Sequence, residues 1–307
     1  MTRACIIVAS HISKSYRLKY LCESLQSLIE QTVIVPIFLS ISFDNELVLN
    51  VYHKIMEKNG LSNNANITIY ERNTKTSQFR HIFNVFESIK SDNDYIMFCD
   101  DDDSYVNNRV ELFINAIEGS LLVMDKQKKF VGVYERKNKK SHSDEYKEYW
   151  SYCISSIYMQ EFFTKINKGS FDKFIDYDIF DVLFASYIRF MDSSHVFVSY
   201  QLKLYNYRKN TRDSITANMI NKSNKIDTAS TFNEFIHNNI IGIKHNILLK
   251  NAMGRNYDID CVLKDAFCKD FLCPNLIMSI SPDMVNEINT YYHEIRHLVT
   301  YMNIYQK

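Results

Sequence analysis

The sequence predicts an α/β fold in which a mostly parallel sheet is flanked by helices, with a helical extension at the C-terminus. Short apolar runs and amphipathic stretches alternate over roughly the first hundred residues, as they do in strand–helix units. The apolar runs are continuous, which is typical of strands buried on both faces. Beyond residue 217 only helical periodicity remains. We therefore expect one domain at 1–217 and a helical extension at 218–307.

Three predicted strand–helix units and a fourth strand open the chain. In each predicted helix the apolar residues recur at spacings of three and four, so that one face is apolar. A later polar segment predicts a mobile loop. The predicted strands span 4–9, 33–42, 67–70, 95–99, 130–134 and 196–204; the predicted helices span 18–29, 47–56, 79–89, 109–117, 158–166 and 176–190; and the loop spans 135–149.

The composition excludes several classes of protein. The chain has 36 basic and 36 acidic residues, so no net charge attracts nucleic acid, and no apolar run of about 18 residues could span a membrane. The N-terminal apolar run is too short for a secretory signal. The seven cysteines include no CxxC pair, which indicates buried thiols. Abundant Asn, Lys, Ile and Tyr indicate an AT-rich bacterial or large-virus genome. We expect a cytoplasmic protein, in the host cytoplasm if it is viral.

Four consecutive aspartates, Asp100 to Asp103, follow the predicted strand at 95–99. Neighbouring carboxylates raise one another's pKa, and a divalent cation relieves the repulsion between them. Carboxylate oxygens suit Mg²⁺ or Mn²⁺, whose other coordination positions are often filled by substrate phosphates. In sheets of this kind, ligands bind at the carboxyl ends of the strands. The run therefore predicts a metal and phosphate site.

Three other interpretations of the acidic run stay open. In the first, Asp103 or Ser104 is the N-cap of the next helix. In the second, the run begins a calcium loop, although Tyr105 stands at the position that requires glycine. In the third, Asp100 is the nucleophile of an aspartyl phosphatase, although three strand–helix units precede it and such enzymes usually place this strand near the chain start.

Several segments of the first domain occur in a characteristic order. IIVASH precedes LCESLQSLIEQT, VPIFLSISFDNE follows, and NTKTSQFRHIFNVFESIKSDNDYIMFCDDDD ends in the aspartates. In this order they resemble the nucleotide loop, second strand, donor loop and DxD motif of the family 2 GT-A glycosyltransferases, across about residues 4–215. The resemblance implies a GT-A-like, Rossmann-like fold, a Mn²⁺ or Mg²⁺ cofactor and a nucleoside-diphosphate-sugar donor.

The resemblance also implies roles for individual positions. Asp100 matches the first DxD residue, near the donor ribose and the metal, Asp102 matches the second, a metal ligand, and Asp101 is an extra carboxylate that shares either task. Other donor contacts are expected in the nucleotide loop and in the donor loop. At the end of the second strand, an acidic side chain is expected to contact the nucleotide base. The alternative for the donor-loop residues is that they form the polar start of a helix. These expected donor contacts are Ser10, His11, Asp44, Gln78, Arg80 and His81.

A second acidic segment supplies a candidate catalytic base. Transfer with inversion requires a carboxylate that takes the proton of the acceptor hydroxyl. The segment GSFDKFIDYDIFDVLFASYI, at 169–188, resembles the family's acidic pair before an apolar helix. Asp176 matches the base best and Asp178 next, while Ile175 stands where the family often has Glu. The alternative is that Asp176 caps the following helix.

A basic segment, YNYRKNTRDSIT, follows the last predicted strand and resembles the family's closing Tyr-Arg segment. We expect Arg208 and Arg212 to bind the diphosphate, because guanidinium groups pair with phosphate oxygens. The alternative is a solvated basic loop.

One further motif is discounted. His293, Glu294 and His297 form an HExxH motif, which holds zinc when it lies on a helix of a metalloprotease. Only ten residues follow His297, and none of them is a His, Cys, Asp or Glu that could serve as a third ligand. We therefore expect an ordinary packed helix here.

The sequence thus predicts metal-dependent transfer of a sugar from a nucleoside-diphosphate-sugar to a hydroxyl group of a glycan or glycoconjugate, with inversion. Two alternatives stay open: a metal-dependent phosphatase or phosphotransferase that uses Asp100, and a catalytically silent carbohydrate-binding protein with the same fold. The apolar stripes of the C-terminal helices are expected to be packing surfaces, through which any homo-oligomer would form.

Overall fold

The computed structural model of the chain describes six segments, all within a compact unit that spans Met1–Lys209. The predicted helical extension at 218–307, the HExxH motif, and the candidate residues Asp178 and Arg212 lie outside the described residues. The described segments are 2–125, 127–136, 148–166, 175–176, 180–189 and 194–208.

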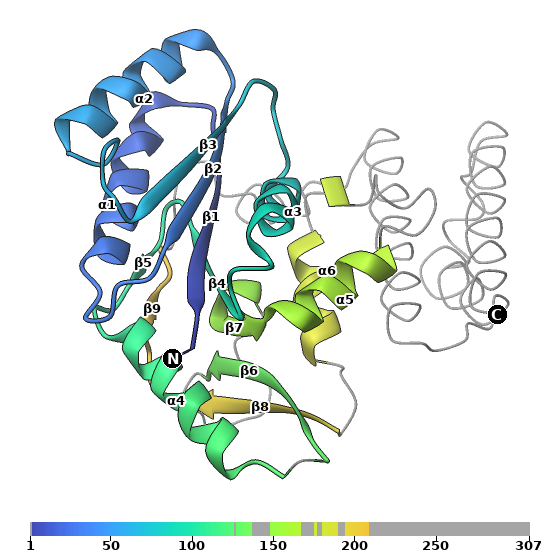
Figure 1. The fold of residues 1–307 in the computed structure, drawn as a ribbon. Helices are drawn as coiled ribbons and strands as arrows, with labels where there is room; N and C mark the ends of the chain where they lie inside the picture. Colours follow the sequence, from blue (N-terminus) through green and yellow to red (C-terminus); the bar gives the residue numbers. More distant parts are fainter. Residues whose placement is uncertain are drawn as a thin grey trace, which may run out of the picture. The chain divides into compact units, whose positions relative to one another are not determined.

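A seven-stranded mixed sheet forms the centre of this unit, with the strand order β3-β2-β1-β4-β7-β6-β8 (Figure 1). Strands β1 to β4 are parallel, β7 runs antiparallel to β4 and β6, and β8 is parallel to β6. Strands β5 and β9 form a separate antiparallel ribbon. The strands are β1 (Ala4–Ile12), β2 (Ile37–Phe43), β3 (Ile67–Arg72), β4 (Tyr95–Asp100), β5 (Ser104–Tyr105), β6 (Lys129–Glu135), β7 (Tyr152–Ser155), β8 (His195–Tyr200) and β9 (Tyr205–Asn206).

Helices cover both faces of the sheet, with α1 and α2 on one face and α3, α5 and α6 on the other (Figure 1). The apolar face of α3 is fully buried against β1 and β2. In the described part of the chain, no helix has both the length and the apolar character needed to cross a bilayer. The predicted α/β class, with a mostly parallel sheet flanked by helices, is confirmed. The helices are α1 (Leu18–Ile29), α2 (Glu46–Lys58), α3 (Gln78–Ile89), α4 (Arg109–Val123), α5 (Ser156–Ile166) and α6 (Phe180–Arg189).

Two predicted strands are shorter than expected. β2 begins at Ile37 because Pro36, which lacks an N–H group, interrupts the predicted run. The alternation predicted over 196–204 breaks after Tyr200, where β8 ends, and the chain then enters the separate ribbon strand β9. This exit from the sheet brings the end of the described chain to the acidic run, which a single longer strand would not do.

The ends of the predicted loop at 135–149 are part of the core. Glu135 is the last residue of β6, and its side chain is completely buried. Tyr149 is buried in the 3₁₀ turn η3 (Tyr149–Ser151), which leads into β7. The loop prediction is therefore wrong for both ends of this segment, whereas 137–147 lies outside the described residues.

Close packing of β6 on β7 depends on a glycine. Gly132 has a positive φ of 155°, and a Cβ atom at this position would overlap the carbonyl oxygen of Cys153. Only glycine fits such a close approach of two backbones. It also lies at the point where the register of β6 against β8 shifts.

A completely buried ion pair joins the second half of the sheet to the acidic run. The guanidinium group of Arg109, the first residue of α4, donates hydrogen bonds to the carboxylate of Glu135 and, at 2.9 Å, to the carbonyl oxygen of Trp150. The carboxylate of Glu135 also accepts the main-chain N–H groups of Leu204 at 2.8 Å and Tyr205 at 3.2 Å. The pair thus fixes α4, β6, η3 and β9 to one another.

We predict that Glu135→Gln, which removes one charge and keeps the side-chain shape, lowers the free energy of unfolding by about 3–5 kcal/mol, because Arg109 is left buried without a counter-charge. Urea denaturation measures this loss. The matched control is Glu87→Gln, whose carboxylate pairs with Lys90 at 2.9 Å on the surface, where the loss should stay below about 1 kcal/mol. Equal losses in both variants would show that the buried pair does not organise this region.

Candidate functional site

The acidic run lies where the strand order of the sheet reverses, beside β1 and β4. From β1 the chain continues to β2 on one side, and β4 lies on the other side of β1 (Figure 1). Ligands of open α/β sheets bind outside the carboxyl ends of the strands at such a switch point. The register pairs Ala9 of β1 with Asp100 of β4, so that Ser10 and Asp101 follow at the same edge. The predicted nucleotide loop and acidic run are therefore neighbours.

The carboxylate of Asp100 is fixed through one of its oxygens. Oδ1 accepts hydrogen bonds from the side-chain amide of Gln78, at 2.9 Å, and from the hydroxyl group of Tyr149. The main-chain N–H of Asp100 donates to the hydroxyl of Tyr205 at 3.0 Å. Burial and the nearby charge of Asp103 raise the pKa of Asp100 well above its usual range. Oδ2 accepts no hydrogen bond from any described residue, so this oxygen remains without a protein partner there.

Asp101 and Asp102 have different surroundings. Asp101 is buried, and its carboxylate accepts hydrogen bonds from the hydroxyl of Ser10 at 2.6 Å and from Arg17 at 2.9 Å. The carboxylate of Asp102 accepts no hydrogen bond from another described side chain, and its nearest cation is Arg17 at 3.8 Å. Burial and the charge of Asp101 raise the pKa of Asp102. Asp102 is therefore the carboxylate most available to a cation.

Asp103 points into the protein. Its side chain is 1% exposed, and Oδ1 accepts the main-chain N–H of Arg208 at 2.6 Å. Oδ2 is buried without a hydrogen-bond partner in the described part of the chain, and burial raises the pKa of this carboxyl group to about 7. The interpretation of Asp103 or Ser104 as a helix N-cap is wrong, because α4 begins only at Arg109, after β5 and the N-cap residue Asn108.

Arg208 clamps the acidic turn. Its Nε atom donates to the carbonyl oxygen of Asp102 at 2.8 Å, and its guanidinium group pairs with Glu23 and lies 4.5 Å from the ring centre of Tyr20. These contacts bring the predicted basic segment to the predicted site. They also hold the guanidinium group on partners within the protein, so that a diphosphate would have to compete with Glu23 for it.

Two predicted nucleotide contacts, His11 and Asp44, lie at the carboxyl ends of β1 and β2. The imidazole of His11 contacts the hydroxyl of Ser42 at 2.9 Å and the carboxylate of Asp44 at 2.8 Å. The side chain of Asp44 remains 41% exposed. His11 and Asp44 thus form an accessible polar pair beside the acidic run.

His81 is unsuited to the nucleotide contact that we expected. Its side chain is completely buried, and its two ring nitrogens contact the hydroxyl groups of Ser40 at 2.8 Å and Ser42 at 3.0 Å. Burial, with the charges of Arg72 and His11, lowers the pKa of His81 to about 3, so the ring is neutral. We therefore remove His81 from the donor contacts; it supports Ser42, which in turn contacts His11.

Asp176 forms a two-point ion pair with Arg80. Nε and a terminal nitrogen of Arg80 donate to its two oxygens at 3.0 and 2.7 Å, and the hydroxyl of Ser77 donates at 2.9 Å. Burial alone would raise the pKa of Asp176, but the hydrogen bonds from Arg80 and Ser77 lower it below its usual range. Asp176 is thus held as a half-exposed anion by the start of α3.

The first turn of α3 positions both candidate carboxylates. Ser77 is the N-cap of α3 and accepts the main-chain N–H of Arg80 at 3.3 Å. Gln78 then reaches Asp100, whereas Arg80 reaches Asp176. Three polar residues at the start of one helix, Ser77, Gln78 and Arg80, therefore connect the predicted metal site to the predicted base.

An aromatic wall and one cation of the site were not predicted from the sequence. The ring of Trp150 stacks on Tyr205, with centres 4.0 Å apart at 12°, and lies parallel to the ring of Tyr207, which is 44% exposed. Tyr149 contacts Asp100, and Arg17 contacts Asp101. The two tyrosines of the YNYR motif were a sequence signal for the aromatic wall. For Arg17 the only sequence signal was its position just before the first helix.

The carboxylate oxygens of the acidic run suit a hard divalent cation. Among the described residues, no three His, Cys, Asp or Glu side chains converge as a complete set of metal ligands. Asp100 and Asp102 offer carboxylate oxygens that accept no hydrogen bond from a described side chain, and an unpartnered buried oxygen of Asp103 belongs to the same acidic turn. Mg²⁺ and Mn²⁺ are commonly held by one or two carboxylates, with substrate phosphates in other positions.

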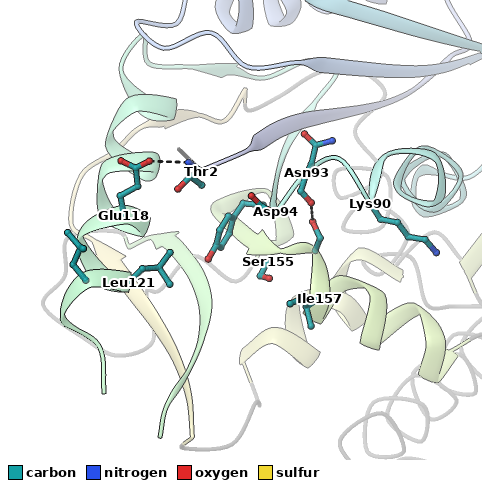
Figure 2. A pocket seen from close by; sticks show the side chains of 11 residues that line it. Thr2, Lys90, Asn93, Asp94, Glu118, Leu121, Ser155 and Ile157 are labelled. Atoms are coloured by element: carbon teal, nitrogen blue, oxygen red, sulfur yellow. Dashed lines mark hydrogen bonds between the residues drawn. The ribbon is translucent and has the colours of Figure 1, made fainter. Parts of the chain in front are cut away.

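A separate cavity of about 730 Å³ lies where β1 and β4 begin, at the opposite edge of the sheet (Figure 2). Its wall includes Glu118, whose carboxylate accepts the main-chain N–H of Thr2 at 3.1 Å. None of the predicted site residues lines it. The lining residues are Thr2, Lys90, Asn93, Asp94, Tyr95, Glu118, Leu121, Leu122, Ser155, Ser156 and Ile157.

No protein-family model matches the chain, and no curated protein matches it. Among solved structures, it is similar to the mannosyltransferase PcManGT from Pyrobaculum calidifontis in complex with GDP-Man and Mn²⁺ (12% identity, TM-score 0.46, 99% of this chain and 84% of that one). It is also similar to TarS from S. aureus (10%, 0.45, 98% and 54%), and so spans about half of that chain. A third structure is the 4-diphosphocytidyl-2C-methyl-D-erythritol synthase from Anaerococcus prevotii (14%, 0.43, 72% and 96%). At such low TM-scores and identities, a functional argument rests on this chain's own residues.

We predict that the stability of the metal-free protein depends on pH through Asp103. With a folded pKa of about 7 and an unfolded value of about 4, the native state binds more protons than the unfolded state in this range, so stability falls as pH rises through it. Asp103→Asn removes this contribution to the pH dependence of stability. The free energy of unfolding of the variant relative to the native chain should therefore improve by about 2–3 kcal/mol between about pH 5 and pH 8. Urea denaturation in EDTA measures it, and a pH-independent difference would contradict the assignment.

Proposed function

We propose that the chain is a metal-dependent glycosyltransferase that moves a sugar from a nucleoside-diphosphate-sugar to a hydroxyl group of a glycan or another acceptor. The observation that carries the proposal is the pair of carboxylates at the switch point of an α/β sheet: Asp100 is held by the protein through one oxygen only, and Asp102 accepts no hydrogen bond from another described side chain. Two arginines hold the same acidic turn: Arg17 pairs with the carboxylates of Asp101 and Asp102, and Arg208 donates to the carbonyl oxygen of Asp102. A site that combines open carboxylates with nearby guanidinium groups suits a cation and a diphosphate together.

The donor would be held between the ends of β1, β2 and β4. Asp100 and Asp102 would ligate Mn²⁺ or Mg²⁺, which supplies positive charge to the departing diphosphate. The polar pair of His11 and Asp44 would face the nucleoside, because it is accessible at the adjacent strand ends. The carbonyl-anchored Arg208 would keep the acidic turn in place rather than bind phosphate through its whole guanidinium group.

Asp176 is the described residue that we propose as the base. It would accept the proton of the acceptor hydroxyl as the new glycosidic C–O bond forms at the anomeric carbon and the bond to the diphosphate oxygen breaks. The leaving nucleoside diphosphate takes the bonding electron pair, and the configuration at the anomeric carbon is inverted. Arg80 keeps Asp176 ionised, so that it is ready to accept a proton at neutral pH, although the lowered pKa weakens it as a base.

Nucleotide-sugar turnover separates the proposal from its alternatives. Purified protein is incubated with a panel of nucleotide sugars and Mn²⁺, with and without EDTA, and release of nucleoside diphosphate is measured. Metal-dependent release supports a glycosyltransferase. Hydrolysis of simple phosphomonoesters instead would support a phosphatase that uses Asp100, and binding of a sugar without any release would support a silent carbohydrate-binding protein.

We predict that Asp102→Ala abolishes both metal-dependent release and metal-dependent donor binding, while circular dichroism shows an unchanged fold, because this carboxylate is the least engaged with the protein. Asp92→Ala is the matched control: it removes an exposed carboxylate near the opposite end of β4 and should leave both properties unchanged. Full activity of Asp102→Ala would contradict the metal assignment.

A pH profile tests Asp176 as the base. Arg80→Gln removes the charge and hydrogen bonds that lower the pKa of Asp176, so the acidic limb of kcat/KM should move to higher pH. Lys75→Gln removes an exposed charge just before the same helix and should leave the limb in place. If both variants keep the native profile while Arg80→Gln only loses rate, Asp176 is not the group whose ionisation limits the reaction.

A further inference from the structure

Arg17 is the cation closest to the open carboxylate of the acidic run. It ends the 3₁₀ turn η1 (Ser15–Arg17) between β1 and α1. One terminal nitrogen of its guanidinium group lies 2.9 Å from Oδ1 of Asp101 and 3.8 Å from Oδ2 of Asp102. The side chain is 20% exposed. A positive group therefore already stands between two of the carboxylates that a divalent cation would neutralise.

The two arginines of the site are held very differently. Arg208 is fixed through its main-chain N–H, its Nε atom and a terminal nitrogen, which bond to Asp103, Asp102 and Glu23. In the described part of the chain, the side chain of Arg17 makes a single hydrogen bond, to Asp101. Its remaining N–H groups are thus available to another acceptor.

The turn that carries Arg17 lies at the surface. The residues before Arg17, from Lys14 to Tyr16, are exposed, and no residue of the turn is buried. The chain becomes buried again only at Leu18, where α1 begins. A shift of the Arg17 side chain by a few ångströms would therefore cost little packing.

We infer that Arg17 is an exchangeable counter-ion that couples metal binding to diphosphate binding. Without metal, its guanidinium group neutralises Asp101 and Asp102. A dication on Asp102 would repel the guanidinium group at this short range, so Arg17 would leave Asp102 and direct its free N–H groups to the diphosphate. The inference rests on the proposed function, and it makes Arg17 a residue that selects for a diphosphate bound together with a metal.

The coupling predicts opposite effects on two ligands, each measured without turnover. Arg17→Gln should tighten binding of Mn²⁺ alone by about five- to tenfold, because a competing positive charge is removed; the loss of the free Mn²⁺ signal in electron paramagnetic resonance reports this binding. The same variant should weaken binding of inorganic pyrophosphate to the Mn²⁺-saturated protein by about tenfold or more, as measured by titration calorimetry.

The control is Lys14→Gln, which removes an exposed charge from the residue just before the same turn. It should change neither affinity by more than about twofold, because screened exposed charges contribute little. Opposite changes in Arg17→Gln, absent from the control, support the coupling. If Arg17→Gln weakens both ligands, Arg17 only maintains the site, and if it matches the control, Arg17 has no role; either result overturns the inference while the proposed function stands. Failure of the native chain to bind Mn²⁺ would overturn the proposed function as well.

Discussion

Repulsion between four adjacent carboxylates at the end of a buried strand is the constraint on which the site depends. The structure separates these groups by giving each a different environment. Asp101 turns to Ser10 and Arg17, Asp103 turns inward to a main-chain N–H group, and Asp100 is held by Gln78 and Tyr149. Asp102 is left at the edge with little compensation, which is the arrangement that a bound cation would complete.

The partners of the carboxylates come from distant parts of the sequence, and a second electrostatic feature brings them together. The buried pair of Arg109 and Glu135 holds the main chain at Trp150 and Tyr205. Tyr205 in turn accepts the N–H group of Asp100 and stacks on Trp150. An ion pair in the core of the domain thus helps to shape the polar edge that carries the proposed site.

The first half of the fold could be predicted because continuous apolar runs and helical periodicity are local signals, and β1, β3 and β4 follow them closely. The partners that complete the site could not. Arg109 at a helix start and Glu135 beside a polar segment have the sequence context of surface residues, and only tertiary packing buries them. His81 was expected at a ligand because it matches a donor-loop position of the resembled family, yet its position on the buried face of α3 places it in the core. A polar residue type alone does not show which face of a helix carries it.

The central claim is that the edge formed by Asp100 and Asp102 binds a divalent cation together with the diphosphate of a sugar nucleotide. A crystal of the full chain soaked with Mn²⁺ and a nucleoside-diphosphate-sugar tests it most directly, because manganese is located by its anomalous scattering. The account predicts one manganese peak in contact with the carboxylates of Asp100 and Asp102 and with the diphosphate oxygens. A manganese ion or a diphosphate bound elsewhere, with these two carboxylates unliganded, would contradict it.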